Sequence, residues 1–132
     1  MIPADGWYEW VKNPDDPKQK QPYYIHRKDG EPMYFAGIGQ FRRDGSGPKE
    51  GDGFVIITTD SDQGVVDIHD RRPVVFTPET AANWLNLDLA KDEAALMARQ
   101  RESVEAFEWY PVGREVGNVR NDGESLQKPK VR

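Results

Sequence analysis

Aromatic side chains are concentrated in short, strand-like segments of this 132-residue chain, and polar loops rich in proline and glycine separate those segments. Fourteen residues are aromatic (four Trp, five Tyr and five Phe), although only 36% of the chain is hydrophobic. Disordered chains are poor in aromatic residues, so the pattern predicts a folded, loop-rich domain with a small aromatic core. Strand-like segments dominate and helical ones come late in the chain, which indicates the α+β class. The strand-like segments are residues 7–11, 23–27, 33–38, 54–59, 74–76 and 107–112.

Local signals predict how several of these segments are joined and bounded. Asp29 followed by Gly30 is typical of a β-hairpin, because both central positions of a type I′ turn need a positive φ. The apolar, β-branched run at 54–59 predicts a central strand that is buried on both faces. Thr77 followed by proline predicts the start of a helix, and a second helix is expected within residues 92–101.

Composition excludes several kinds of site. The chain has no cysteine, so it contains no disulfide, no thiolate metal site and no cysteine nucleophile. Only two histidines are present, so a structural zinc site is not expected. We also expect no cofactor. No apolar run approaches the roughly 20 residues of a membrane span, and residues 1–6 lack the features of a signal peptide, so we expect a cytoplasmic protein. A net charge of -5 argues against a wholly basic surface but leaves room for a local basic groove.

Glu9 is the first candidate for a chemical role. In a strand over 7–11, Glu9 shares a face with Trp7 and Val11, which are apolar. A carboxylate on an apolar face is costly unless it is paired or protonated, and a raised pKa would suit it to proton transfer near neutral pH. The alternative is an exposed glutamate on an edge strand.

The segment 67–73 is the second candidate, because one histidine, His69, sits among two acidic residues and two arginines. Histidine can exchange a proton near pH 7, and an arginine such as Arg71 can neutralise a carboxylate or bind a phosphate. The alternative is a polar turn with a salt-bridge network. A metal site built from residues 67, 69 and 70 is not favoured, because neighbours in an extended strand point to opposite faces. The other histidine, His26, lies in a predicted hairpin and is expected to be structural.

Two further polar segments have open interpretations. Thr58 and Thr59 end a strand-like segment, where hydroxyl groups can bond a phosphate or a backbone group, or can simply reflect β-propensity. Residues 118–122 (NVRND) either contribute to a site or form a polar turn in which Asn and Asp satisfy backbone groups.

Several short motifs occur together in an order that resembles the SRAP family, the SOS-response-associated peptidase or abasic-site-processing proteins. The resemblance spreads over nearly all of the chain, and the ordered set carries more weight than any one motif. The motifs are residues 2–10 (IPADGWYEW), 21–25 (QPYYI), 35–38 (FAGI), 56–60 (IITTD), 67–71 (DIHDR) with Pro73 and Val74, and 110–112 (YPV) with 118–122 (NVRND).

The resemblance implies a compact α+β domain, a distorted β-barrel with a few short peripheral helices. It implies that the protein binds single-stranded DNA and forms a covalent thiazolidine crosslink at an abasic site, through a cysteine that self-processing places at the N-terminus. By the same resemblance, Glu9 moves protons at the cysteine amine and His69 assists opening of the sugar ring. Thr58 and Arg71 would contact DNA phosphate near the lesion.

The chain departs from the family pattern because it contains no cysteine. The resemblance places the segment with the nucleophile upstream of Met1, so that residues 1–132 form the C-terminal majority of one SRAP domain, with a loop at 42–53 and a polar tail at 118–132. Two smaller departures are Arg72, where the family usually has methionine, and Gly117, where it usually has asparagine.

The missing segment has consequences for the isolated chain. Lost N-terminal strands would leave sheet edges and apolar surface uncovered, so we expect the chain to be poorly stable, oligomeric or completed by a separate polypeptide. Without a nucleophile the chain alone should form no crosslink. Two alternative functions stay open: a cysteine-free module that binds single-stranded DNA, and a peptidase that acts on other substrates. When bound to DNA, the protein would associate with the nucleoid.

Overall fold

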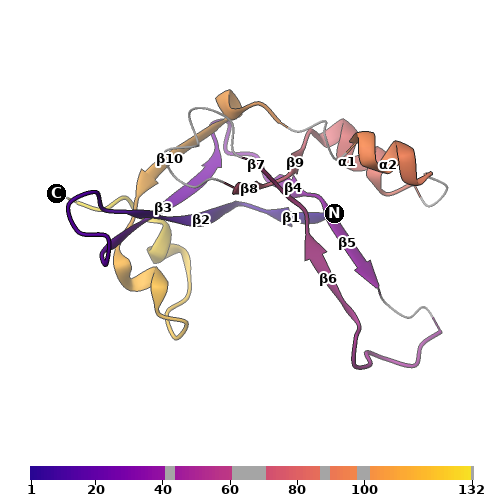
Figure 1. Ribbon diagram of the computed structural model, residues 1–132, viewed down its shortest axis with the longest axis horizontal. Coiled ribbons are helices and arrows are strands. Elements are labelled where there is room, and N and C mark those ends of the chain that lie inside the picture. The colour runs from indigo at the N-terminus through magenta and orange to yellow at the C-terminus, as the bar shows by residue number, and fades with distance from the viewer. Residues whose placement is uncertain (41–43, 61–70, 87–89, 98–101, 132) are drawn as a thin grey trace. The chain divides into compact units, whose positions relative to one another are not determined.

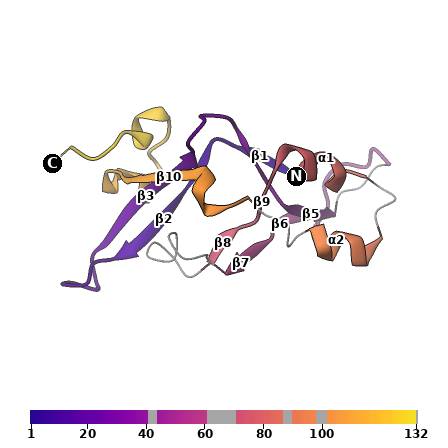
Figure 2. The same cartoon turned by 90° about the horizontal axis from the view of Figure 1, so that it is seen from above.

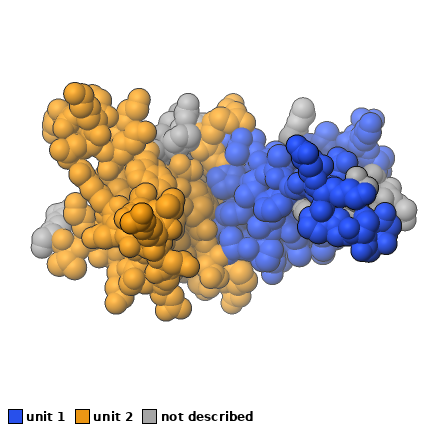
Figure 3. Space-filling view, turned by 90° about the horizontal axis from the view of Figure 1, so that it is seen from below, with its two compact units in different colours: residues 1–4, 33–59, 73–102 blue, residues 5–32, 60–72, 103–132 orange. Residues whose placement is uncertain are grey.

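The computed structural model describes residues 1–40, 44–60, 71–86, 90–97 and 102–131. The chain divides into two compact units, which Figure 3 shows in two colours. In the described residues, antiparallel strands predominate and the two α-helices are short, which confirms the α+β class. No helix in this part of the chain is long and apolar enough to cross a membrane. Unit 1 comprises residues 1–4, 33–59 and 73–102, and unit 2 comprises residues 5–32, 60–72 and 103–132.

The main element of unit 2 is a three-stranded antiparallel sheet with the order β10-β3-β2, whose strands lie side by side in Figures 1 and 2. Trp7 and Trp109 lie on either side of Ile25 in the register, and at the end of the hairpin Lys12 lies opposite Lys20. The strands are β2 (Gly6–Lys12), β3 (Lys20–Arg27) and β10 (Phe107–Pro111).

The two faces of this sheet are packed in different ways. On one face Ile25 and Phe107 are buried, and the Trp7 ring meets Phe107 edge-on with 5.6 Å between the ring centres. On the other face the Tyr110 hydroxyl donates a hydrogen bond to the Gln127 carbonyl. Two 3-10 turns belong to the segment that follows β10, Arg114–Gly117 and Glu124–Gln127.

Unit 1 is built around a second three-stranded sheet, in the order β1-β4-β9. Ala36, Val74, Phe76 and Ala81 form its buried core. The strands are β1 (Ile2–Ala4), β4 (Met33–Phe35) and β9 (Val75–Phe76), and the helices are α1 (Pro78–Trp84) and α2 (Lys91–Met97). The side chain of Thr77 caps α1 by accepting a hydrogen bond from the Thr80 amide at 3.2 Å, which confirms the predicted helix start.

Two pairs of strands complete the described structure. Strand β5 (Gly37–Gln40) pairs with β6 (Gly53–Ile56), and β7 (Thr58–Asp60) pairs with β8 (Arg71–Pro73). The strands of the described residues therefore form four separate sheets, and they do not close into the barrel that the resemblance implied.

Two predictions about strand partners are wrong. Gly30 does adopt a positive φ of 72°, but β3 and β4, on either side of this turn, pair in different sheets and form no hairpin. The run at 54–59 is not one central strand: it is divided between β6 and β7, and Phe54 and Val55 are 57% and 63% exposed. Strand β6 pairs with β5 alone among the described strands, which leaves its apolar side chains uncovered.

Candidate functional site

Glu9 lies in the middle of β2, directly opposite Tyr23 of β3. Because side chains alternate along a strand, Glu9 projects from the face that carries Trp7 and Phe107. This confirms the predicted orientation toward apolar neighbours. Glu9 is half-buried, so part of the residue stays accessible to solvent.

The consecutive arginines of β8 have different environments. The Arg71 guanidinium forms an ion pair with the Asp60 carboxylate at 3.0 Å, on the exposed surface of unit 2. Arg72 is 1% exposed, and its guanidinium carbon lies 5.8 Å from the centre of the Phe107 ring. A planar guanidinium stacks well on aromatic rings, so Arg72 is part of the core. Of the two arginines, Arg71 is therefore the one that is accessible to a ligand.

The other predicted site residues are only partly described. Thr58 is exposed at the start of β7 and belongs to unit 1, whereas Glu9 and Arg71 belong to unit 2. His69 lies outside the described residues, as do the other two residues of the metal site that was not favoured. Within the described ranges, no group of three or more His, Asp or Glu side chains could hold a metal ion.

His26 is held by its neighbours in the sheet. Its ring stacks on Tyr24 with 5.6 Å between the centres, and its Nε2 atom lies 3.2 Å from the Glu108 carboxylate on the opposing strand. The contacts support the structural role predicted from the sequence.

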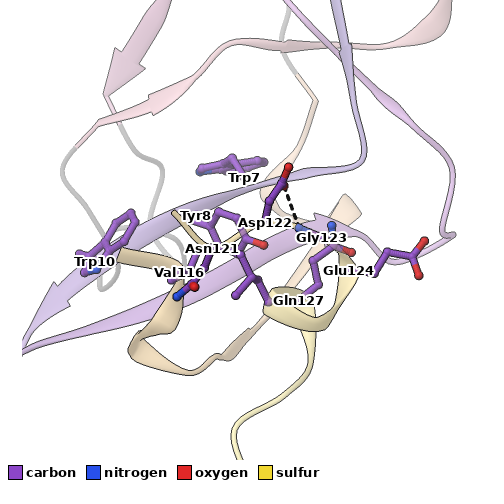
Figure 4. A pocket seen from close by; sticks show the side chains of 10 residues that line it. Trp7, Tyr8, Trp10, Val116, Asn121, Asp122, Gly123, Glu124 and Gln127 are labelled. Atoms are coloured by element: carbon purple, nitrogen blue, oxygen red, sulfur yellow. Dashed lines mark hydrogen bonds between the residues drawn. The ribbon is translucent and has the colours of Figure 1, made fainter. Parts of the chain in front are cut away.

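A pocket of about 730 Å³ lies between β2 and the segment after β10, all within unit 2 (Figure 4). One wall is aromatic and comes from β2; the other is mainly polar and comes from the C-terminal segment. The lining residues are Trp7, Tyr8, Trp10, Val116, Asn121, Asp122, Gly123, Glu124, Leu126 and Gln127. Flat aromatic rings facing amide and carboxylate groups can stack on a planar ligand and also hydrogen-bond its edge.

Burial changes the ionisation of the tyrosines beside this pocket. Desolvation raises the pKa of Tyr8, and the charges of Tyr110 and Asp122 add to the effect. Desolvation, followed by the charges of Asp5, Tyr110 and Tyr8, raises the pKa of Tyr24 to about 12. These phenols therefore stay protonated at physiological pH, and the Tyr8 hydroxyl can donate a hydrogen bond to a ligand.

The sequence did not single out this pocket, although it pointed to both walls. The strand alternation placed Tyr8 and Trp10 together on one face of β2, and residues 118–122 were recognised as polar. Local hydrogen bonds match the polar-turn alternative: the Asn118 side chain accepts from the Arg120 amide at 3.0 Å, and the Asn121 side chain donates to the Glu115 carbonyl at 2.9 Å.

Comparison with known families decides what kind of protein carries these features. The sequence profile of the family described as SOS response associated peptidase (SRAP) matches residues 1–119. This chain belongs to the SRAP family. The motifs that resembled SRAP proteins in the sequence thus lie in a chain whose membership the profile shows.

Curated SRAP relatives carry the name abasic site processing protein. YedK of Escherichia coli is 45% identical over 129 residues, covering 96% of this chain and 55% of YedK. YoqW of Bacillus subtilis is 33% identical over 129 residues, with the same coverage of each chain, and HMCES of Rattus norvegicus is 29% identical, covering 92% of this chain and 40% of HMCES. The chain spans about half the length of the bacterial SRAP relatives.

Solved structures give the same result for the fold. A phage-related protein from Bordetella bronchiseptica superposes with a TM-score of 0.71 at 46% identity, covering 84% of this chain and 51% of that chain. A protein from Bacteroides thetaiotaomicron superposes with a TM-score of 0.77 at 28% identity, covering 98% and 56%. The SRAP chain therefore shares its fold with about half of each of these larger structures.

Proposed function

We propose that this chain is part of a DNA-damage-response protein that recognises abasic sites in single-stranded DNA and becomes covalently linked to them. The observation that carries the proposal is Glu9, a half-buried acidic residue on the face of β2 that carries Trp7, in an SRAP chain. The abasic-site-processing names of the curated relatives support the substrate class.

In the proposed reaction, an amine and a thiol of one cysteine condense with the aldehyde of the ring-opened sugar. The amine nitrogen and the sulfur each form a bond to the aldehyde carbon, and the oxygen leaves as water. Glu9 would accept the proton from the attacking amine and return it to the departing oxygen, as a general base and then a general acid. This chain has no cysteine, so another segment would supply the nucleophile, and the peptidase-like self-processing of that segment would expose its amine.

The aromatic pocket, whose Tyr8 and Trp10 lie on the opposite face of β2 from Glu9, would hold a neighbouring nucleotide of the same strand. Stacking of a base on an aromatic side chain contributes about 1–3 kcal/mol and tolerates any sequence, because every base has a π-face. Trp10, which is 38% exposed, offers such a surface, and Asn121 on the facing wall offers hydrogen bonds.

The resemblance gives Arg71, Thr58 and His69 further roles in the proposed reaction. Arg71 can exchange its exposed partner Asp60 for a phosphate, because exposed ion pairs contribute only about 0.2–1 kcal/mol. Thr58, an exposed residue, would make a second phosphate contact, as the resemblance implies. His69 would assist sugar ring opening, as the resemblance implies.

The test combines a binding and a covalent readout. The chain is mixed with an oligonucleotide that carries one abasic site, with and without the part of YedK that this chain does not match. We expect preferential binding over an oligonucleotide with an intact base. A heat-stable adduct should appear only when the added part supplies a cysteine.

A matched pair of variants isolates the role of Glu9. Replacing Glu9→Gln should slow adduct formation by about 10²–10⁴-fold, the usual contribution of a general acid/base. The exposed Glu31→Gln should leave the rate unchanged. Equal binding to both oligonucleotides, together with no adduct, would show that the proposed function is wrong.

Two other functions have observations in their favour. The lack of a cysteine favours a module that binds single-stranded DNA without chemistry, which would bind both oligonucleotides equally. The family description contains the word peptidase, which favours cleavage of other peptides. That second function requires cleavage of an unrelated peptide that disappears in Glu9→Gln.

A further inference from the structure

A second hollow, of about 420 Å³, lies at the end of the β2–β3 hairpin in unit 2. Four cationic side chains line it and no acidic side chain does, in a chain whose net charge is -5. We call it the basic groove. Its cations are Lys12, Lys20, Arg114 and Lys130.

Two of the four cations of the basic groove contact neutral side chains. The Arg114 guanidinium donates to the Gln19 side chain at 2.8 Å, and the Lys130 ammonium lies 3.4 Å from the Gln21 side-chain oxygen. Within the described part of the chain, none of the four cations forms an ion pair with a carboxylate. Their charges therefore remain available to an anion.

One pair of these cations opposes the stability of the sheet. Lys12 and Lys20 are direct partners in the β2–β3 register, so their side chains leave the same face next to each other. Like charges in such a pair are destabilising. A local conflict of this kind is expected where function requires it, and here the conflict would be relieved by a bound polyanion.

The aromatic pocket and the basic groove are lined by nearby residues of the same two segments of the chain. On β2, Trp10 lines the pocket and Lys12 lines the groove, and two residues of a strand span about 7 Å. In the C-terminal segment, Val116 lines the pocket and Arg114 lines the groove. A ligand that follows both segments would meet aromatic rings first and cations next.

We propose that the basic groove binds the phosphodiester backbone of single-stranded DNA beside the nucleotide held in the aromatic pocket. The inference rests on the proposed function and adds a phosphate-contact site away from the lesion chemistry. A nucleic-acid strand fits the observations because it presents bases and phosphates in succession, as the pocket and the groove require. The contacts are electrostatic, so the groove would increase affinity without reading the sequence.

The experiment compares two double variants that change the net charge equally. Lys12→Gln with Lys20→Gln removes two groove cations, and the control, Lys28→Gln with Lys91→Gln, removes two exposed lysines outside the groove lining. Affinity for an intact single-stranded oligonucleotide is measured between 50 and 200 mM salt. The groove variant should lower the slope of log K against log salt by about 1.4 and weaken binding about 25-fold at 0.1 M, because each phosphate contact on a single strand contributes about 0.7. The control should change neither value.

The outcomes separate this inference from the proposed function. If the groove variant and the control bind equally while abasic DNA is still preferred, the groove inference is wrong and the proposed function stands. If inorganic phosphate shifts the amide resonances of Lys12 and Lys20 but DNA affinity does not depend on them, the groove is a small-anion site and the inference is again wrong. If the unchanged chain binds no single-stranded DNA at any salt concentration, both proposals are wrong.

Discussion

The β2–β3–β10 sheet of unit 2 and the β5–β6 hairpin of unit 1 are both made of short antiparallel strands. Apolar side chains are buried in the sheet and exposed in the hairpin. Ile25 and Phe107 in the sheet are at most 1% exposed, whereas Phe54 and Val55 in the hairpin are more than half exposed. The sheet has a third strand and packed side chains over its central residues, whereas among the described strands the β5–β6 hairpin has no third strand. The comparison teaches that burial depends on what covers a strand, and that apolar composition alone does not determine it.

The largest expected effect tests this contrast directly with two phenylalanines. Phe107→Ala should lower the free energy of unfolding by about 3–5 kcal/mol, because it leaves a cavity under Trp7 and Arg72. Phe54→Ala should change it by less than about 0.5 kcal/mol, as for most exposed positions. Urea unfolding followed by tryptophan fluorescence measures both. Similar losses for the two variants would mean that another surface covers the hairpin in solution.

The next effect concerns alkaline pH and only the sheet of unit 2. The pKa of Tyr24 is raised to about 12 in the folded state, against an ordinary value of 10.0. Between these pH values the unfolded chain releases the phenol proton and the folded chain keeps it. The contribution to stability is therefore complete below pH 10 and is lost as the pH rises toward 12.

Tyr24→Phe keeps the ring but removes this ionisation. We expect the urea midpoint to fall less between pH 9 and pH 11 in the variant than in the unchanged chain. Equal slopes would show that Tyr24 is ionised as easily in the folded sheet as in the unfolded chain. The raised pKa values of Tyr8 and Tyr110 act in the same direction and would leave a residual slope.

The smallest expected effect compares two parts of the sheet in unit 2: the charged end at Lys12 and Lys20 and the packed centre of the sheet. Lys20→Gln removes the repulsion from Lys12 on the opposing strand and should increase the free energy of unfolding by about 0.2–1 kcal/mol. Lys28→Gln serves as the control and should have no such effect. Thermal unfolding at low salt measures the difference, which should shrink at high salt. A loss of stability in Lys20→Gln would contradict the idea that the hairpin end is electrostatically strained.

The sequence predicted features that depend on neighbouring residues. The aromatic strands, the cap at Thr77 and the orientation of Glu9 follow from side-chain type and strand alternation, and the structure confirms them. The turn at Gly30 was also predicted, but the partner of the following strand was not, because turn chemistry is local and strand pairing is not.

Features that join distant segments could not be predicted in the same way. The run at 54–59 looked like a buried strand because its composition is apolar, but burial depends on which strands lie beside it. The aromatic pocket and the basic groove both combine β2 with residues about a hundred positions later. Net charge left room for a basic groove without showing where it lies, and His69 stays a prediction, outside the described residues.

The opposed lysines at the end of the β2–β3 hairpin link the stability of the fold to ligand binding in the basic groove. A ligand that neutralises Lys12 and Lys20 gives the folded hairpin end more stability than an ordinary surface contact would, because it also removes a repulsion that the unfolded chain does not have. Ligand binding in the groove should therefore stabilise this end of the sheet more than its centre, where Ile25 is already buried. In the empty protein the strands should separate first at this same end, so a bound polyanion would also stabilise the hairpin against opening.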